Sequence, residues 1–294
     1  MIKSLKSVKA IMQPPAFHMV GDGFRVHNFF PSSSLIGMNG MSPFFLMDYN
    51  SKWYVPPSMR PRGVGVHPHR GFETVTIAYQ GKVAHHDSAG NSGVISEGDV
   101  QWMTAGAGVL HKEYHEKEFS KKGGIFQMVQ IWVNLPAKFK MTPAKYQAIE
   151  SGQMGKYKSA DRNSIVNIIA GEYNGIKGPA FTFSSLNMFN ASLMKEAKIS
   201  FSFPEIHNTG ILIIEGEVKL NEAETATENQ FVFFGHNGDE INIEALKEST
   251  LLVLSGEPIN EPIASYGPFV MNTDDEIKTA YEDYNDGKFG YLED

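Results

Sequence analysis

Two short motifs in the first half of the chain contain residues that could bind a metal ion. One motif holds His67 and His69, and the other holds His111 and Glu113. In an extended strand, residues two apart project from the same face, so each motif could present two ligand atoms to one point. Three imidazoles and one carboxylate suit a divalent first-row metal ion, and coordination beyond these four ligands would leave positions for water, O2 or substrate.

A helical zinc site is the alternative for the second motif, because His111 and His115 are four residues apart. The zincin motif needs Glu directly after the first His, and Lys112 occupies that position here. The strand interpretation is therefore favoured. His85 precedes the turn at residues 88–91 and His207 has no neighbouring His partner, so both are expected to be structural or to lie on the surface.

Composition excludes several classes of function. The chain has no cysteine, which excludes disulfides, thiolate metal sites and cysteine nucleophiles. Its net charge is −7 and no Lys/Arg run is present, so direct nucleic-acid binding is not expected. No leader pattern and no long apolar run is visible, and the expected location is the cytoplasm, away from membranes.

Period-two apolar patterns and β-branched runs dominate the sequence and predict an all-β fold. Gly-bearing turns separate the runs, as expected for antiparallel β-sandwiches or barrels. A single longer helix is predicted near the end, where Thr273 and Glu276 can form a capping box and Gly287 can stop the helix. The predicted strands are 73–79, 93–95, 127–134, 165–170, 186–193, 211–220, 230–234 and 250–254.

The length of 294 residues is that of roughly two ordinary domains. The polar stretch 150–161 interrupts strand-like sequence and is the candidate linker. We therefore predict domains at 1–150 and 151–294. A weak internal repeat, with Gly81 and Gly216 each in a turn before a strand, suggests that the halves arose by duplication.

Several blocks of this sequence closely resemble proteins of the pirin family, which belongs to the cupin superfamily. The similarity extends over nearly the whole chain and is weakest between about residues 150 and 250. The blocks that carry it are 67–76, 87–93, 98–106, 130–136, 256–258 and 266–273.

The resemblance implies two cupin-type β-sandwich or barrel domains with one divalent metal ion in domain 1–150. It implies His67, His69, His111 and Glu113 as the ligands and Fe(II) as the ion, with Mn, Ni, Cu, Co or Zn as other occupants. Domain 151–294 would lack metal ligands, and its sequence contains no His-x-His. In the wider superfamily the Glu that follows the His pair binds metal, and that residue is Glu73. Strand parity alone would allow either Glu73 or Glu113.

Two classes of function follow from this resemblance. The enzyme hypothesis is a quercetinase-like dioxygenase that cleaves a flavonol or related phenolic substrate with O2, with Glu113 or Glu73 as the base. The apolar residues expected to wall the substrate are Phe72, Trp102, Phe126 and Met128. The alternative is a metal- and redox-dependent regulator that binds a protein partner, either a transcription factor or a metabolic enzyme. An open cleft at the metal would favour the enzyme, and a sealed metal would favour the regulator.

Overall fold

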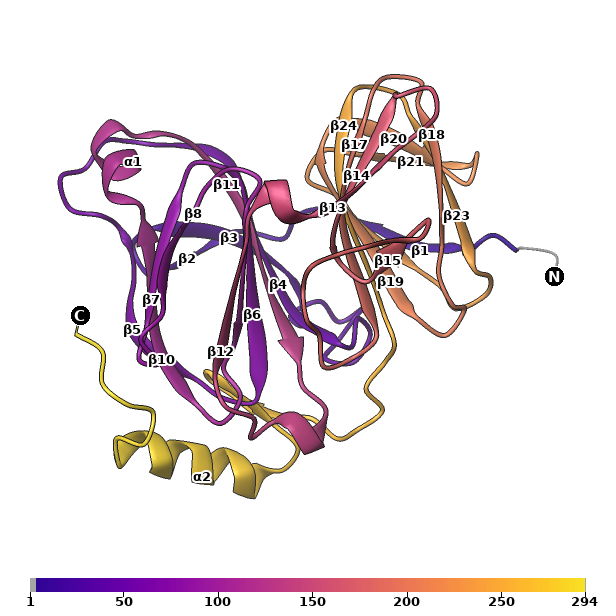
Figure 1. Ribbon diagram of the computed structural model, residues 1–294. Helices are drawn as coiled ribbons and strands as arrows, with labels where there is room; N and C mark the ends of the chain where they lie inside the picture. Colours follow the sequence, from indigo (N-terminus) through magenta and orange to yellow (C-terminus); the bar gives the residue numbers. More distant parts are fainter. Residues whose placement is uncertain (1–3, 294) are drawn as a thin grey trace. The chain divides into compact units, whose positions relative to one another are not determined.

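The computed structural model describes residues 4–293, and most of their regular structure is β-strand (Figure 1). The chain folds as two compact units. The His unit comprises residues 16–38, 44–151 and 259–293, and the apolar unit comprises the described residues up to Pro15 together with 39–43 and 152–258. Each unit is thus built from three stretches of chain, whereas the domains predicted from sequence are contiguous.

The His unit contains two main sheets, which Figure 1 shows as two layers. The larger has seven strands in the order β12-β9-β6-β11-β4-β3-β2, and the smaller has four in the order β5-β10-β7-β8. The larger sheet consists of β2 (His18–Val20), β3 (Phe24–Phe30), β4 (Phe44–Val55), β6 (Phe72–Gln80), β9 (Val100–Thr104), β11 (Gly124–Asn134) and β12 (Lys145–Ile149). The smaller sheet consists of β5 (Gly63–His69), β7 (Val83–Asp87), β8 (Ser92–Ile95) and β10 (Val109–His115).

The apolar unit repeats this arrangement with a seven-stranded sheet, β1-β22-β19-β24-β17-β14-β13, and a four-stranded sheet, β18-β23-β20-β21. A short β15-β16 hairpin (Glu172–Tyr173, Ile176–Lys177) completes it. The larger sheet consists of β1 (Val8–Met12), β13 (Gly155–Lys158), β14 (Ser164–Ala170), β17 (Leu186–Leu193), β19 (Asn208–Glu215), β22 (Phe231–Phe234) and β24 (Ser249–Gly256). The smaller sheet consists of β18 (Lys198–Ser202), β20 (Glu217–Leu220), β21 (Glu224–Thr227) and β23 (Glu240–Ala245).

The strands predicted from the sequence correspond to strands of the structure, and the segment 211–220 is divided into two strands by Gly216. The candidate linker 150–161 is not a free connection, because it contains the short helix η2 (Ser151–Gln153) and strand β13 of the apolar unit. Strand β1 pairs with β22 at the edge of the same sheet. No local pattern marked this pairing, which joins residues more than two hundred positions apart.

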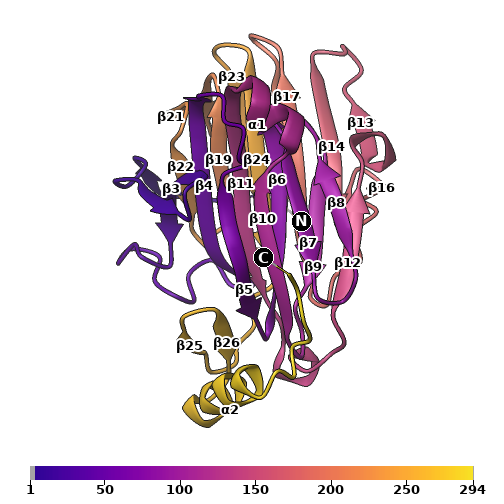
Figure 2. The same cartoon turned by 90° about the vertical axis from the view of Figure 1, so that its left-hand side faces the viewer.

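The predicted C-terminal helix is α2 (Asp274–Asn285), and it lies beside the hairpin β25 (Ala264–Tyr266) and β26 (Phe269–Met271) (Figure 2). Thr273 is its N-cap and forms the predicted capping box with Glu276. The short helices α1 (Lys117–Lys122) and η1 (Ala137–Phe139) were not predicted from the sequence. Within residues 4–293, no helix is both long enough and apolar enough to cross a membrane.

Candidate metal centre

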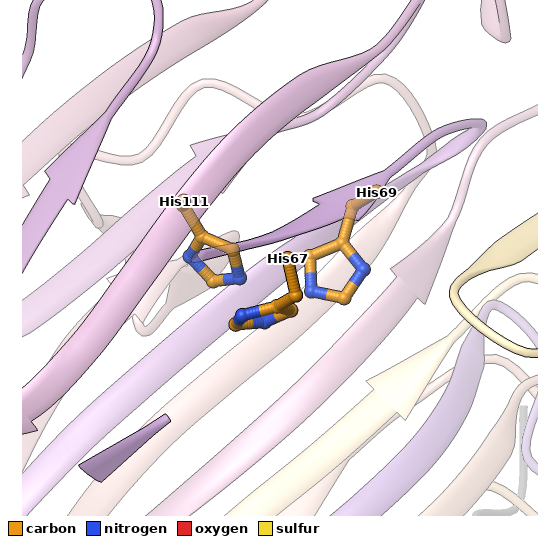
Figure 3. Close-up of side chains that lie close together, drawn as sticks. All are labelled: His67, His69 and His111. Carbon is orange, nitrogen blue, oxygen red and sulfur yellow. The ribbon is translucent and has the colours of Figure 1, made fainter. Parts of the chain in front are cut away.

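Strands β5 and β10 bring the two His-containing motifs together. They pair antiparallel with His111 directly opposite His67, and His69 lies two residues further along the same strand face. The ring centroids are separated by 4.2 Å for His67 and His111, 4.7 Å for His69 and His111, and 4.9 Å for His67 and His69. Figure 3 shows the three rings gathered around a common space. Because β10 is a strand as far as His115, the helical zinc interpretation is wrong.

The hydrogen bonds of these rings leave nitrogen lone pairs available. The Nδ1 atoms of His67 and His69 lie 2.8 Å and 3.3 Å from the carbonyl oxygens of Gly65 and Pro268. A carbonyl can only accept, so Nδ1 carries the proton in both rings and each Nε2 keeps its lone pair. His111 is fully buried, and neither ring nitrogen has a hydrogen-bond partner within residues 4–293. A buried, unpartnered imidazole is costly unless another group, such as a metal ion, engages it.

Burial also keeps these imidazoles neutral. Loss of solvation lowers the pKa of His67, and it holds the pKa values of His69 and His111 well below the ordinary value. The neighbouring imidazoles lower the last two further. Neutral imidazole is the form that binds metal, so the three rings are ready ligands at neutral pH.

The Glu113 carboxylate is buried on the same face of β10 as His111. Two polar side chains of the opposite sheet hold it: Thr76 Oγ1 donates to Oε1 at 3.2 Å, and Gln130 Nε2 donates to Oε2 at 2.7 Å. A carboxylate oriented in this way can still offer a lone pair to an ion, because each oxygen has more than one acceptor site.

His85 also lies at this centre, which sequence reasoning missed. It is fully buried on β7 opposite Glu113, and its ring centroid is 5.4 Å from that of His111. Potential ligand atoms of His85, His111 and Glu113 lie within 4.8 Å of one another, as do those of His67, His69 and His111. One sequence signal could have pointed to His85. It lies two residues before Asp87, the same spacing as in the pairs His67/His69 and His111/Glu113, so both side chains share one strand face.

Both ring nitrogens of His85 have partners, unlike those of His111. Gln101 Nε2 lies 2.9 Å from Nδ1, and Asp87 Oδ2 lies 3.4 Å from Nε2. When the amide donates to Nδ1, the proton of the neutral ring lies on Nε2 and points to Asp87. His85 therefore has less lone-pair capacity to offer an ion than His111.

Glu73 lies on the other face of β6 and is not brought to the imidazoles. It pairs with Thr104, whose hydroxyl donates to Oε1 at 2.7 Å, while Thr76 faces Glu113 on the opposite side of the strand. Burial raises the pKa of Glu73 to about 7. Counting by twos from His69 would place Glu73 on the face of the imidazoles. That count does not hold because Gly71, at φ 87°, turns the chain between β5 and β6.

A cavity of about 310 Å³ opens beside the imidazoles. His67, His69 and Glu113 line it together with Asp48 and Gln130, and the rest of its wall is mostly apolar. This combination of apolar walls and a few polar groups is typical of small-molecule sites. The remaining lining residues are Val20, Phe24, Val26, Val64, Met128, Trp132, Gly267 and Pro268.

The four residues expected to wall a substrate have different positions. Met128 lines the cavity. Phe72 packs against the rings of His69 and Trp132, both of which line the cavity, and so supports the wall from behind. Phe126 packs on Phe24, which lines the cavity. Trp102 is fully buried on the Glu73 face of its sheet, where it pairs with Val75.

Comparison with known proteins identifies relatives of the whole chain. The family model described as Pirin matches residues 23–133, and the one described as Pirin C-terminal cupin domain matches residues 188–290. A Pseudomonas aeruginosa protein named "Putative quercetin 2,3-dioxygenase" is 43% identical over 285 residues, which cover 97% of this chain and 99% of that protein. A Solanum lycopersicum protein named "Pirin-like protein" is 36% identical over 258 residues, covering 86% of this chain and 84% of that one.

A solved structure matches the fold closely. The crystal structure of quercetin 2,3-dioxygenase from Acinetobacter baumannii has a TM-score of 0.92 and 48% sequence identity, covering 99% of this chain and 100% of that chain. The all-β architecture and the cupin family match define a cupin-type protein with a short C-terminal helix, as predicted. Within that class, the chain belongs to the pirin family. It carries a His/Glu group able to hold a metal ion.

Proposed function

We propose that this protein is a metal-dependent dioxygenase that cleaves flavonols or related phenolic compounds with O2. One divalent ion, Fe(II) in the first instance, would be held by His67, His69, His111 and Glu113. The observation that carries this proposal is the convergence of three imidazoles, two buried and one half-buried, beside a cavity large enough for a small molecule. The names of the relatives support the choice of reaction.

The donor set fits such an ion. His111 offers unpartnered ring nitrogens, and His67 and His69 each keep a free Nε2. Glu113 contributes one negative charge, so a bound divalent ion would retain net positive charge. Nitrogen and oxygen ligands of this kind accept Mn, Ni, Cu, Co or Zn as well as iron, and the preference for iron comes from the resemblance to pirins.

The bound ion would acidify a coordinated phenol hydroxyl and provide positions for substrate and O2. The residues of the chain would orient the substrate and accept its proton. Glu113 is the proposed acceptor, because its carboxylate lines the cavity and the donors Thr76 and Gln130 hold it in place. Glu73 is left out of this role because it lies on the opposite face of β6.

The cavity favours an enzyme over a regulator. A regulatory ion that changes a protein-binding surface needs no accessible space beside it, whereas a dioxygenase must admit an aromatic substrate and O2. His67 and His69 both line an open cavity whose walls are largely apolar. Apolar walls suit a flat phenolic ring and exclude water from the reacting groups.

The test is to purify the protein anaerobically, load it with Fe(II), add quercetin in air and follow both O2 consumption and the loss of visible absorbance. Metal-dependent turnover by the wild type, and none by the His67→Ala/His111→Ala double variant, is the expected result. Stoichiometric metal binding without turnover of quercetin or simpler flavonols would contradict the proposed reaction and favour the regulatory alternative.

A further inference from the structure

A row of four polar side chains lies on neighbouring strands of the large sheet, and two of them, Gln130 and Asp48, line the cavity. Thr76 on β6 pairs with Gln130 on β11, Gln130 pairs with Asp48 on β4, and Asp48 pairs with Asn28 on β3. Directly paired residues project from the same face of a sheet, so the four side chains point the same way. One end of the row is the pair of donors that hold Glu113, and Asp48 lies toward the other end.

Asp48 is a second carboxylate in the cavity, and the proposed metal chemistry does not use it. Its Oδ1 accepts a hydrogen bond of 2.7 Å from Asn28 Nδ2. Within residues 4–293 its other oxygen has no hydrogen-bond partner, and the residue lines the cavity. Burial raises the pKa of Asp48, while the Asn28 hydrogen bond and the charge of His18 act in the opposite direction.

A carboxylate beside apolar walls is unfavourable unless donors satisfy it. Asn28 supplies one donor and fixes the orientation of the group, which leaves the second oxygen for a partner that enters the cavity. Strands are about 4.8 Å apart, so the backbones at Asp48 and Thr76 are separated by roughly 10 Å. A ligand that reaches both ends of the row must therefore extend beyond one aromatic ring.

We propose that Asp48 is a specificity-determining residue whose free oxygen accepts a hydrogen bond from a ligand hydroxyl remote from the imidazoles. The pocket would thereby select polyhydroxylated, multi-ring phenols over analogues that lack the distal hydroxyl groups. This inference rests on the proposed function in one respect: the other end of the ligand is taken to lie at the cluster of His67, His69 and His111.

The test compares quercetin with galangin, which has the same flavonol core but no hydroxyl on its pendant ring. Affinities of both ligands for the Fe(II)-loaded protein are measured anaerobically, so that no turnover is needed. Asp48→Ala should weaken quercetin binding by about tenfold to a hundredfold, as expected for a lost hydrogen bond to a charged group, and change galangin binding by less than about twofold. Glu73→Gln is the matched control, because it neutralises a buried carboxylate on the opposite face of the same sheet, and it should alter neither affinity.

Metal content and thermal unfolding are recorded for each variant. If Asp48→Ala loses its fold or its metal, the near-isosteric Asp48→Asn becomes the deciding variant. It should weaken the binding of quercetin by less than Asp48→Ala and leave the binding of galangin unchanged. Equal weakening of both ligands, no weakening, or a wild type that binds neither ligand would overturn the proposal. A quercetin-specific loss without turnover in air would leave the Asp48 assignment standing and reject the dioxygenase.

Discussion

The two units share one strand arrangement but fill its interior in opposite ways. Their turns at Gly81 and Gly216 correspond. In both units the strand before this glycine, β6 or β19, has a β-bulge just before its end. Counting from these landmarks, the position of His111 in β10 matches Ile241 in β23. His67 pairs with His111, and Phe201 pairs with Ile241, so the position of His67 matches that of Phe201.

The polar residues around the imidazoles are replaced in the same manner. Glu113 matches Ile243, and its two donors Thr76 and Gln130 match Ile211 and Val253. All of these matched residues belong to the buried hydrocarbon core of the apolar unit. This fold therefore does not need polar groups at these positions. The polar cluster of the His unit is thus not a requirement of the fold, which supports the metal site that we propose there.

Removing a proposed ligand should produce the largest effect. His111→Ala deletes a ring whose nitrogens have no hydrogen-bond partner among residues 4–293. We expect metal affinity to fall by at least about a hundredfold, with turnover lost. Elemental analysis after anaerobic purification measures this. Full metal occupancy in His111→Ala would show that the ion is bound elsewhere.

The matched substitution in the apolar unit should affect stability and leave the metal in place. Ile241→Ala leaves a cavity in a fully buried core, and we expect the free energy of unfolding to fall by about 2–5 kcal/mol. Denaturant titration measures the loss, and elemental analysis should still find the wild-type amount of metal. A loss of metal as large as that of His111→Ala would break the distinction between the two units.

Glu73→Gln distinguishes the two faces of the large sheet of the His unit. Because the folded pKa of Glu73 is raised to about 7, its contribution to stability is fully present below about pH 4.5 and is lost as pH rises through 7. Relative to wild type, the neutral Gln should therefore gain stability between pH 5 and pH 8, by up to about 3 kcal/mol. Unfolding midpoints at both pH values test this, and a difference independent of pH would contradict it.

Substituting a residue that orients Glu113 should have the smallest effect. Gln130→Met keeps a similar side-chain length but removes the donor to Oε2, and we expect metal affinity to fall about tenfold. Competition with a chelator of known affinity measures the change. Unchanged affinity would mean that Gln130 does not help to hold the carboxylate in its binding position.

Much of the fold could be predicted from local patterns, and the reasons are physical. Alternation within one strand placed His67 with His69 and His111 with Glu113 on shared faces, because strand side chains repeat every two residues. The capping box of α2 was predicted equally well from Thr273 and its partner three residues later.

Prediction stopped where the chain turns or where partners are distant in sequence. The parity argument for Glu73 failed at Gly71, whose positive φ resets the facing of the next strand. His85 looked like part of a turn, but β7 extends through Asp87 and directs the ring inward. Pairing of β4 with β11 within the large sheet also places Asp48 beside Gln130, and no local sequence pattern predicts which strands pair.

In the proposed metal site, His67, His69, His111 and Glu113 of the His unit hold one ion. Anomalous diffraction at the metal edge, on crystals of the Fe(II)-loaded protein grown without O2, tests it most directly. We expect one strong peak within about 2.0–2.3 Å of Nε2 of His67, Nε2 of His69, one ring nitrogen of His111 and an oxygen of Glu113. A peak held instead by His85 and Asp87, or one lying in the apolar unit, would contradict it.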